Sequence, residues 1–221
     1  MSHTLAALST AAPLAAGWTI HGLWQHRLID RAERDELTGL PRRAAFEKNA
    51  ARMLRRTGRD VVAVLVIDLD GFKQVNDIHG HAAGDTAIRE TGRRLAQWAE
   101  PLGTAARLGG DEFAAIIRCP DPDTLRGELT HLHQWLCSPV TYDGLPLPLG
   151  TSIGAYPHTT GFGPAVELPE ALRVADEAMY GVKQTGGGWA ITHTPTPAYR
   201  TVNGRRDGRR GTDLDTAGGT T

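Results

Sequence analysis

Two pairs of acidic residues on separate segments are the side chains best suited to chemistry. Asp68-Leu69-Asp70 follows the apolar run 61–67, and Asp111-Glu112 follows Gly109-Gly110. Mg²⁺ prefers hard oxygen ligands and usually shares one or two protein carboxylates with substrate phosphates. If the two segments are neighbours, Asp68 and Asp111 converge, and two carboxylates over a sheet edge form the core of a two-metal phosphoryl-transfer site. Gly109 and Gly110 lack side chains, so a phosphate can approach the backbone there.

Each acidic pair also has a purely structural interpretation. Acidic residues at the tips of glycine-containing turns are usually just solvated, and Asp-Leu-Asp alone is a common loop. Asp85 is interpreted either as part of a binding site or as the N-cap of a helix. His79 and His81 are interpreted as surface or core side chains rather than as a metal pair.

Lysine is rare in this chain, with three residues against 21 arginines. Lys73 and Lys183 are placed near the two acidic loops, where a compact ammonium charge suits a triphosphate. Asn76 and Asp85 bound a polar stretch between these loops. An amide and a carboxylate together match the acceptor and donor edge of a purine such as guanine.

The elements that must position these residues alternate between helix and strand patterns. The β-branched run 61–67 predicts a buried central strand. Hairpins are predicted around Gly109–Glu112, from 105–108 and 113–118, and around Asp143-Gly144, from 140–142 and 147–156. Trp189–Thr192 predicts an edge strand, and apolar spacing predicts helices over 42–56, around 88–98, after the Asp121-Pro122 cap, and around 172–182. This order predicts an α+β domain with helices on a mainly antiparallel sheet.

The composition excludes several classes of protein. Apolar residues make up 40% and charged residues 22% of the 221 residues, a globular balance. The net charge of −1 gives no indication of nucleic-acid binding. Cys119 and Cys137 are too few for a disulfide scaffold and lack metal-ligand spacing, so both are interpreted as small buried hydrophobes.

The two ends of the chain differ from its middle. Residues 1–25 form an apolar leader, and Thr4–Trp24 is long enough to cross a bilayer of about 30 Å. With residues 26–34 as a short arginine-bearing linker, we expect a single-pass cell-membrane protein whose main domain is cytoplasmic. The alternative is an apolar helix that packs on its own domain or on a partner. Residues 195–221 have little to bury and are expected to be disordered.

Two blocks of the sequence contain the candidate residues described above. Gly109–Phe113 reads GGDEF, and Asp68–Asp85 reads DxDxFKxxNDxxGHxxGD without a break. Because GGDEF is the signature of the diguanylate cyclase family, the sequence resembles that family. Three further blocks follow the family order: Asp35–Arg43 resembles DxLTGLxNR, with Arg42 at the usual Asn, Ser152–Gly154 resembles the SIG strand, and Ala175–Gly186 resembles ADxALYxAKxxG. The resemblance covers about residues 35–192, within an expected catalytic domain of 35–194, and these blocks are jointly very specific.

The resemblance implies a palm-like nucleotidyl cyclase domain and a signalling transferase. Two domains of a homodimer would face each other, each holding one GTP with Mg²⁺ or Mn²⁺. The 3′-hydroxyl of one GTP would attack the α-phosphate of the other, twice, giving cyclic di-GMP and two pyrophosphates.

It also implies roles for individual residues. Asp68, Asp111 and the Leu69 carbonyl resemble the metal ligands, and Glu112 would assist the metal site and the attacking hydroxyl. Lys73, which forms the family's FK pair with Phe72, would act near the phosphates as a third catalytic residue beside Asp111 and Glu112. Further residues resemble substrate contacts: Asn76 and Asp85 for guanine, Phe72, Lys183 as a second phosphate-binding lysine, and Gly110 for close approach.

Two departures from the family pattern matter. Gly187 stands where the family usually has a phosphate-binding arginine, which is expected to weaken GTP binding or turnover by about 1 to 3 kcal/mol. The inhibitory RxxD site of many cyclases is absent, because its positions hold Glu100 and Gly103. Product feedback through that site is therefore not expected.

Three functional hypotheses remain. The first is an active diguanylate cyclase, favoured by the intact metal and guanine positions. The second is a GGDEF domain that binds GTP without turnover and signals to a partner, favoured by the lost arginine. The third, a cyclic di-GMP receptor, is disfavoured because the RxxD site is gone.

Overall fold

The structure is a computed structural model that describes residues 33–55, 58, 60–159 and 166–193. It also gives the backbone of a short strand pair, β8 (Thr201–Val202) and β9 (Arg205–Arg206). The expected leader, residues 1–25, lies outside the described residues, as does most of the expected tail. The predicted domain boundaries therefore stay predictions.

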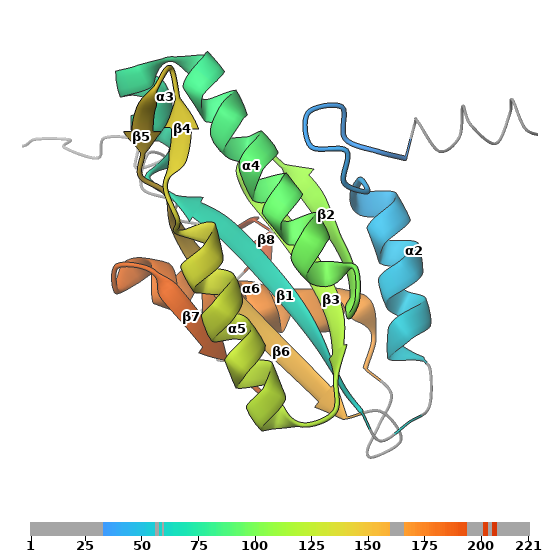
Figure 1. The fold of residues 1–221 in the computed structure, drawn as a ribbon. Coiled ribbons are helices and arrows are strands. Elements are labelled where there is room, and N and C mark those ends of the chain that lie inside the picture. The colour runs from blue at the N-terminus through green and yellow to red at the C-terminus, as the bar shows by residue number, and fades with distance from the viewer. Residues whose placement is uncertain are drawn as a thin grey trace, which may run out of the picture.

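A five-stranded sheet forms the centre of the domain, with the order β2-β3-β1-β6-β7 (Figure 1). Its strands are β1 (Val61–Asp70), β2 (Gly103–Gly109), β3 (Glu112–Cys119), β6 (Gly150–Thr159) and β7 (Gly188–Ile191). Neighbouring strands are antiparallel except β6 and β7, which are parallel. The predicted mainly antiparallel sheet, its buried central strand and its GGDEF hairpin are confirmed.

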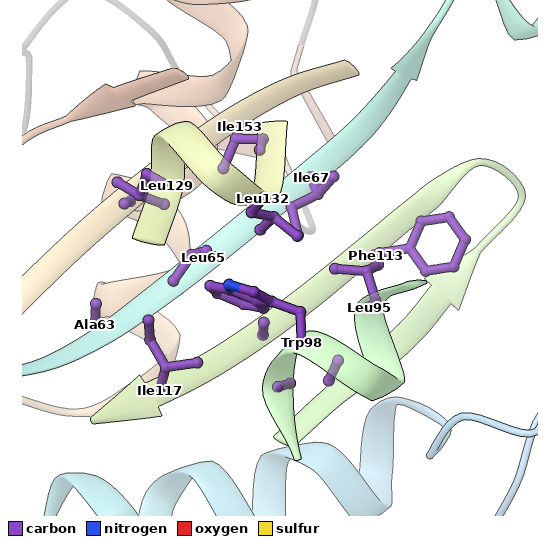
Figure 2. Close-up of a cluster of buried hydrophobic side chains, with 14 of the residues drawn as sticks. Ala63, Leu65, Ile67, Leu95, Trp98, Phe113, Ile117, Leu129, Leu132 and Ile153 are labelled. Atoms are coloured by element: carbon purple, nitrogen blue, oxygen red, sulfur yellow. The ribbon is translucent and has the colours of Figure 1, made fainter. Parts of the chain in front are cut away.

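Helices cover both faces of the sheet. The helices α4 (His81–Ala99) and α5 (Pro122–Leu136) pack on one face, and α2 (Arg43–Leu54) and α6 (Leu168–Gln184) pack on the other. Because successive side chains of a strand point to opposite faces, β1 contributes Ala63, Leu65 and Ile67 to the α4–α5 core (Figure 2) and Val62 and Val64 to the α2–α6 core. Both faces are buried, which explains the unbroken apolar run.

The segment Asp68–Asp70 is not the loop that the sequence predicted. It forms the last three residues of β1 and pairs with Ser152, Thr151 and Gly150 of β6. Strand alternation places Asp68 and Asp70 on the α6 face and Leu69 on the α4–α5 face, where it is buried. The backbone positions of Asp68 and Asp70 are therefore set by regular strand pairing and not by the geometry of a turn.

The polar stretch after β1 contains an additional helix, α3 (Phe72–His79), between two glycines with positive φ, Gly71 and Gly80. Gly80 precedes the first residue of α4, and Asp85 lies within that helix. The N-cap interpretation of Asp85 is therefore wrong.

The second predicted hairpin is shorter than expected. β4 (Val140–Tyr142) pairs with β5 (Leu145–Leu147), and residues 150–156 belong to β6 of the central sheet instead. The hairpin packs on α3 and α4 through an apolar cluster that includes Val140 and Leu147. The residues predicted as one strand, 147–156, therefore belong to two strands in different sheets, β5 and β6.

The predicted cell-membrane localisation is corrected. Among the residues that the structure describes, no helix is long and apolar enough to cross a membrane. The 19-residue α4 illustrates why, because it carries charged side chains along its length, Asp85, Arg89, Glu90, Arg93 and Arg94. The apolar segment Thr4–Trp24, on which the prediction rested, is outside the described residues.

Candidate active site

The candidate site lies where the end of β1 meets the tip of the β2–β3 hairpin. Asp68 pairs in register with Glu112, and the Leu69 N–H donates a 3.4 Å hydrogen bond to the carbonyl oxygen of Asp111. The strand order β3-β1 therefore brings the two acidic segments together. Asp68 is 1% exposed, whereas Asp111 and Glu112 are half-buried.

Lys183 reaches this edge from the last turn of α6. Its ammonium group donates a hydrogen bond to Oδ1 of Asp68, and the two side chains form an ion pair. A carboxylate as buried as Asp68 needs compensation for its lost hydration. The structure thus places Lys183 beside the carboxylate that the sequence assigned to metal binding.

Asp70 points to the same face as Asp68 but has different neighbours. The Ser152 hydroxyl donates a 2.7 Å hydrogen bond to Oδ1 of Asp70. A Cβ atom at Gly187 would lie 2.7 Å from Oδ2 of Asp70, and the φ angle there is +95°. The glycine that replaces the expected arginine therefore has a backbone that other residues rarely adopt, directly against Asp70.

The helix α3 carries three of the predicted site residues, Phe72, Lys73 and Asn76. Phe72 packs between two hydrophobic clusters, and Lys73 is exposed. The Asn76 side chain lies against Gly84 of α4, because a Cβ atom at Gly84 would be 2.0 Å from Oδ1 of Asn76. Asp85 follows directly and lies 4.0 Å from Arg89. The structure thus brings the segments of Asn76 and Asp85 together across the α3–α4 contact.

The hairpin tip is held by an arginine that the sequence reasoning missed. Arg107 of β2 donates two hydrogen bonds to the carbonyl oxygen of Gly110, from Nε at 3.0 Å and from Nη2 at 2.8 Å. It also forms an ion pair with Asp35. Asp35 opens the first block of the family resemblance, but 72 positions separate the pair, and no local pattern connects them.

The donor chemistry fits a hard cation. In the described part of the chain, no group of three or more His, Cys, Asp or Glu side chains could hold a metal ion. Mg²⁺ does not need such a cage, because it commonly takes one or two carboxylates together with substrate phosphates and water. Asp68, Asp111 and the Leu69 carbonyl supply that kind of oxygen set.

The position of the RxxD aspartate is sterically closed. A Cβ atom at Gly103 would lie 1.9 Å from the backbone oxygen of Ile116 on the paired strand. An aspartate therefore cannot occupy this position without moving the β2–β3 ladder. The absence of the RxxD motif is consistent with this packing.

Comparison with known proteins agrees with the fold. The family model described as "Diguanylate cyclase, GGDEF domain" matches residues 32–188. A 19.3 kDa protein from Streptomyces ambofaciens is 45% identical over 175 residues, which cover 79% of this chain and 91% of that protein.

Two further relatives carry more specific descriptions. Diguanylate cyclase TpbB from Pseudomonas aeruginosa is 45% identical over 103 residues, which cover 42% of this chain and 24% of that protein. The coiled coil and GGDEF domain of DgcB from Caulobacter crescentus, solved in complex with c-di-GMP, is 25% identical with a TM-score of 0.70. That match covers 83% of this chain and 100% of the solved chain. The chain belongs to the GGDEF-domain family of diguanylate cyclases.

Proposed function

We propose that this protein is a diguanylate cyclase that condenses two GTP molecules into cyclic di-GMP and releases two pyrophosphates. The observation that carries the proposal is the meeting of Asp68 and Leu69 with the Asp111-Glu112 hairpin, with Lys183 at the same edge. Carboxylates, a backbone carbonyl and a lysine in one place suit a triphosphate with a divalent cation.

The substrate would bind between this edge and the α3–α4 contact. Asn76 and Asp85 offer an amide and a carboxylate for the guanine edge, and Lys73 and Lys183 offer compact positive charges for the phosphates. Gly110 leaves the backbone accessible at the hairpin tip, and Phe72 anchors α3 to the core. These assignments place both ends of a nucleotide on one domain.

The chemistry requires two domains. In a homodimer, the 3′-oxygen of one GTP attacks the α-phosphorus of the other, the bond to the bridging oxygen breaks, and pyrophosphate leaves. Glu112 would assist the attacking hydroxyl, and a second, symmetrical step closes the ring. Mg²⁺ or Mn²⁺, held by Asp68, Leu69 and Asp111, would neutralise charge on the phosphates.

The alternative is a GTP-binding signalling module with little turnover. Gly187 favours it, because the side chain that the family uses there for phosphate binding is absent. The residues proposed for metal and guanine binding favour the enzyme instead.

The purified full-length chain, incubated with GTP and Mg²⁺, tests the two functions directly. Chromatography should reveal cyclic di-GMP and two equivalents of pyrophosphate, and specific activity should rise with protein concentration if a homodimer is required. If the chain binds GTP but forms no cyclic di-GMP at any protein concentration, the cyclase proposal is wrong and the GTP-binding signalling module is favoured.

A further inference from the structure

Arg107 uses its planar guanidinium to connect two segments far apart in the sequence. Nε and Nη2 both donate to the carbonyl oxygen of Gly110, at 3.0 and 2.8 Å, and Nη1 lies 3.1 Å from each carboxylate oxygen of Asp35. The Arg107 side chain is 16% exposed and that of Asp35 is 21% exposed. An arginine fork in such a setting is more constrained than a flexible surface pair.

The hairpin tip has few other constraints. Gly109 and Gly110 have φ angles of +149° and +55°, and the β2–β3 register is irregular between Arg107 and Gly109. The backbone bond from this tip to β1, between Leu69 N–H and the Asp111 carbonyl, is long at 3.4 Å. Glycine has the greatest backbone freedom of any residue, so the ladder alone fixes this tip poorly.

Holding the Gly110 carbonyl also orients Asp111. The Gly110 carbonyl and the Asp111 N–H belong to one planar peptide unit, in which the two bonds point in opposite directions. Because Arg107 fixes the carbonyl end, it restricts the direction of the Asp111 N–H and Cα. The backbone that carries Asp111, the proposed metal ligand, is therefore held by Arg107 of β2.

Asp35 holds the guanidinium in turn. It accepts hydrogen bonds from the N–H and hydroxyl of Thr38, at 2.9 and 2.8 Å, within a turn closed by the bond from Asp35 N–H to the Leu40 carbonyl. Thr38 rests on Gly92 of α4, where a Cβ atom would lie 2.6 Å from that of Thr38. Burial raises the pKa of Asp35, but the hydrogen bonds from Thr38 and Arg107 outweigh it and lower the pKa below its usual value.

We propose that Arg107 is a positioning residue for the catalytic hairpin: it fixes the Gly110–Asp111 peptide, and Asp35 keeps its guanidinium in place. The inference rests on the proposed cyclase function. Residues 33–41 are therefore connected to the hairpin in two ways. The Asp35 side chain binds the Arg107 guanidinium, and the Arg107 N–H donates a hydrogen bond to the Pro41 carbonyl.

Kinetics of Arg107→Met in the full-length chain test the role in catalysis. This change keeps most of the apolar stem and removes every side-chain donor, so kcat should fall by about ten- to a hundred-fold while the KM for GTP changes by less than about three-fold. Arg107→Lys, which keeps the charge without the fork, should recover only part of kcat. Millimolar guanidinium should partly restore Arg107→Ala.

Arg118→Met is the matched control, because Arg118 forms a comparable ion pair with Asp60, 3.3 Å away at the other end of β3. It should keep kcat. An Arg107→Met enzyme with unchanged kcat, or one whose only defect is a melting temperature lowered as much as in Arg118→Met, overturns the proposal.

Hydrogen–deuterium exchange separates this proposal from the proposed function. The peptide covering residues 108–113 should exchange faster in Arg107→Met and in Asp35→Asn, and not in Arg118→Met. If the wild-type chain makes no cyclic di-GMP, the cyclase proposal fails, while the exchange result still decides whether Arg107 fixes the hairpin. Unchanged exchange in both variants overturns the positioning role.

Discussion

Lys183 of α6 donates a hydrogen bond to Asp68 of β1, across 115 positions of the sequence. Asp68 is 1% exposed, so the lysine compensates a carboxylate that has lost nearly all of its hydration. The proposed function gives both residues other tasks, Asp68 toward a cation and Lys183 toward phosphates. We therefore predict that Lys183 exchanges partners when substrate and metal bind.

Lys183→Met should lower the free energy of unfolding by about 1 to 3 kcal/mol in metal-free buffer, because it leaves a buried carboxylate without its cationic partner. Mg²⁺ should recover part of that loss and stabilise the variant more than the wild type. Urea unfolding with and without Mg²⁺ measures both effects. Lys48→Met, which removes an exposed lysine on α2, is the control. Equal Mg²⁺ stabilisation of the wild type and Lys183→Met would contradict the exchange of partners.

Asp111→Ala should abolish product formation and leave the fold intact. The change lies on the hairpin turn, where substitutions usually alter stability by less than about 0.5 kcal/mol. Asp143→Ala provides the comparison, because Asp143 lies in the β4–β5 turn outside the candidate site. It should keep its activity. Wild-type rates of cyclic di-GMP formation by Asp111→Ala would show that the metal assignment is wrong.

Gly187→Arg, which restores the family residue, should not rescue a slow enzyme. The φ angle of +95° is rarely adopted by other residues, and the new Cβ atom would lie 2.7 Å from Oδ2 of Asp70. The variant should lose about 1 to 3 kcal/mol of stability through backbone strain, and its KM for GTP should not fall. Thermal unfolding and initial rates measure the two effects. A tenfold gain in kcat/KM without loss of stability would refute this prediction.

Asp35 should contribute a pH-dependent part of the stability. Because its folded-state pKa lies below the ordinary value of 3.8, its contribution is complete above that value and is lost as the pH falls through the lower folded pKa. The stability difference between wild type and Asp35→Asn should thus stay constant from about pH 7 to pH 5 and shrink below about pH 4. Urea unfolding across this range measures it. If the stability difference between wild type and Asp35→Asn grew on acidification, the pKa of Asp35 would be raised in the folded state and not lowered.

The sequence predicted the elements whose apolar pattern is strong. The apolar run in β1 predicts a strand and the leucine spacing in α5 predicts a helix, and each pattern is strong because the segment has a buried face. By contrast, α3 has eight residues and buries none of them completely. The alternation Leu145-Pro146-Leu147-Pro148-Leu149 continues the pattern of one strand through what is the junction between β5 and β6.

The candidate site likewise has one part that the sequence predicts and another part that depends on tertiary packing. The meeting of the segments that carry Asp68 and Asp111 is predictable, because hairpin strands next to a buried strand tend to pair with it. The Arg107–Asp35 pair and the contact of Asn76 with Gly84 depend on tertiary packing, which no local pattern encodes. Gly84 is an indirect signal of such packing, since a glycine inside a helix costs about 1 kcal/mol relative to alanine and needs a reason to be there.

That packing gives a test of guanine recognition at a residue that does not itself contact the base. In Gly84→Ala, the new Cβ atom would lie 2.0 Å from Oδ1 of Asn76 and 3.2 Å from Cζ of Phe72, so the Asn76 amide must move. If Asn76 and Asp85 hold guanine, the KM for GTP should rise about tenfold, equivalent to one hydrogen bond of about 1.4 kcal/mol. The preference for GTP over ATP should narrow, because the lost contact is specific to the base.

Gly127→Ala is the matched control for Gly84→Ala, because it changes a glycine inside α5 whose Cβ atom would meet nothing within 4 Å. It should keep its KM and gain up to about 1 kcal/mol of stability. An unchanged KM and an unchanged GTP preference in Gly84→Ala would exclude Asn76 from base recognition.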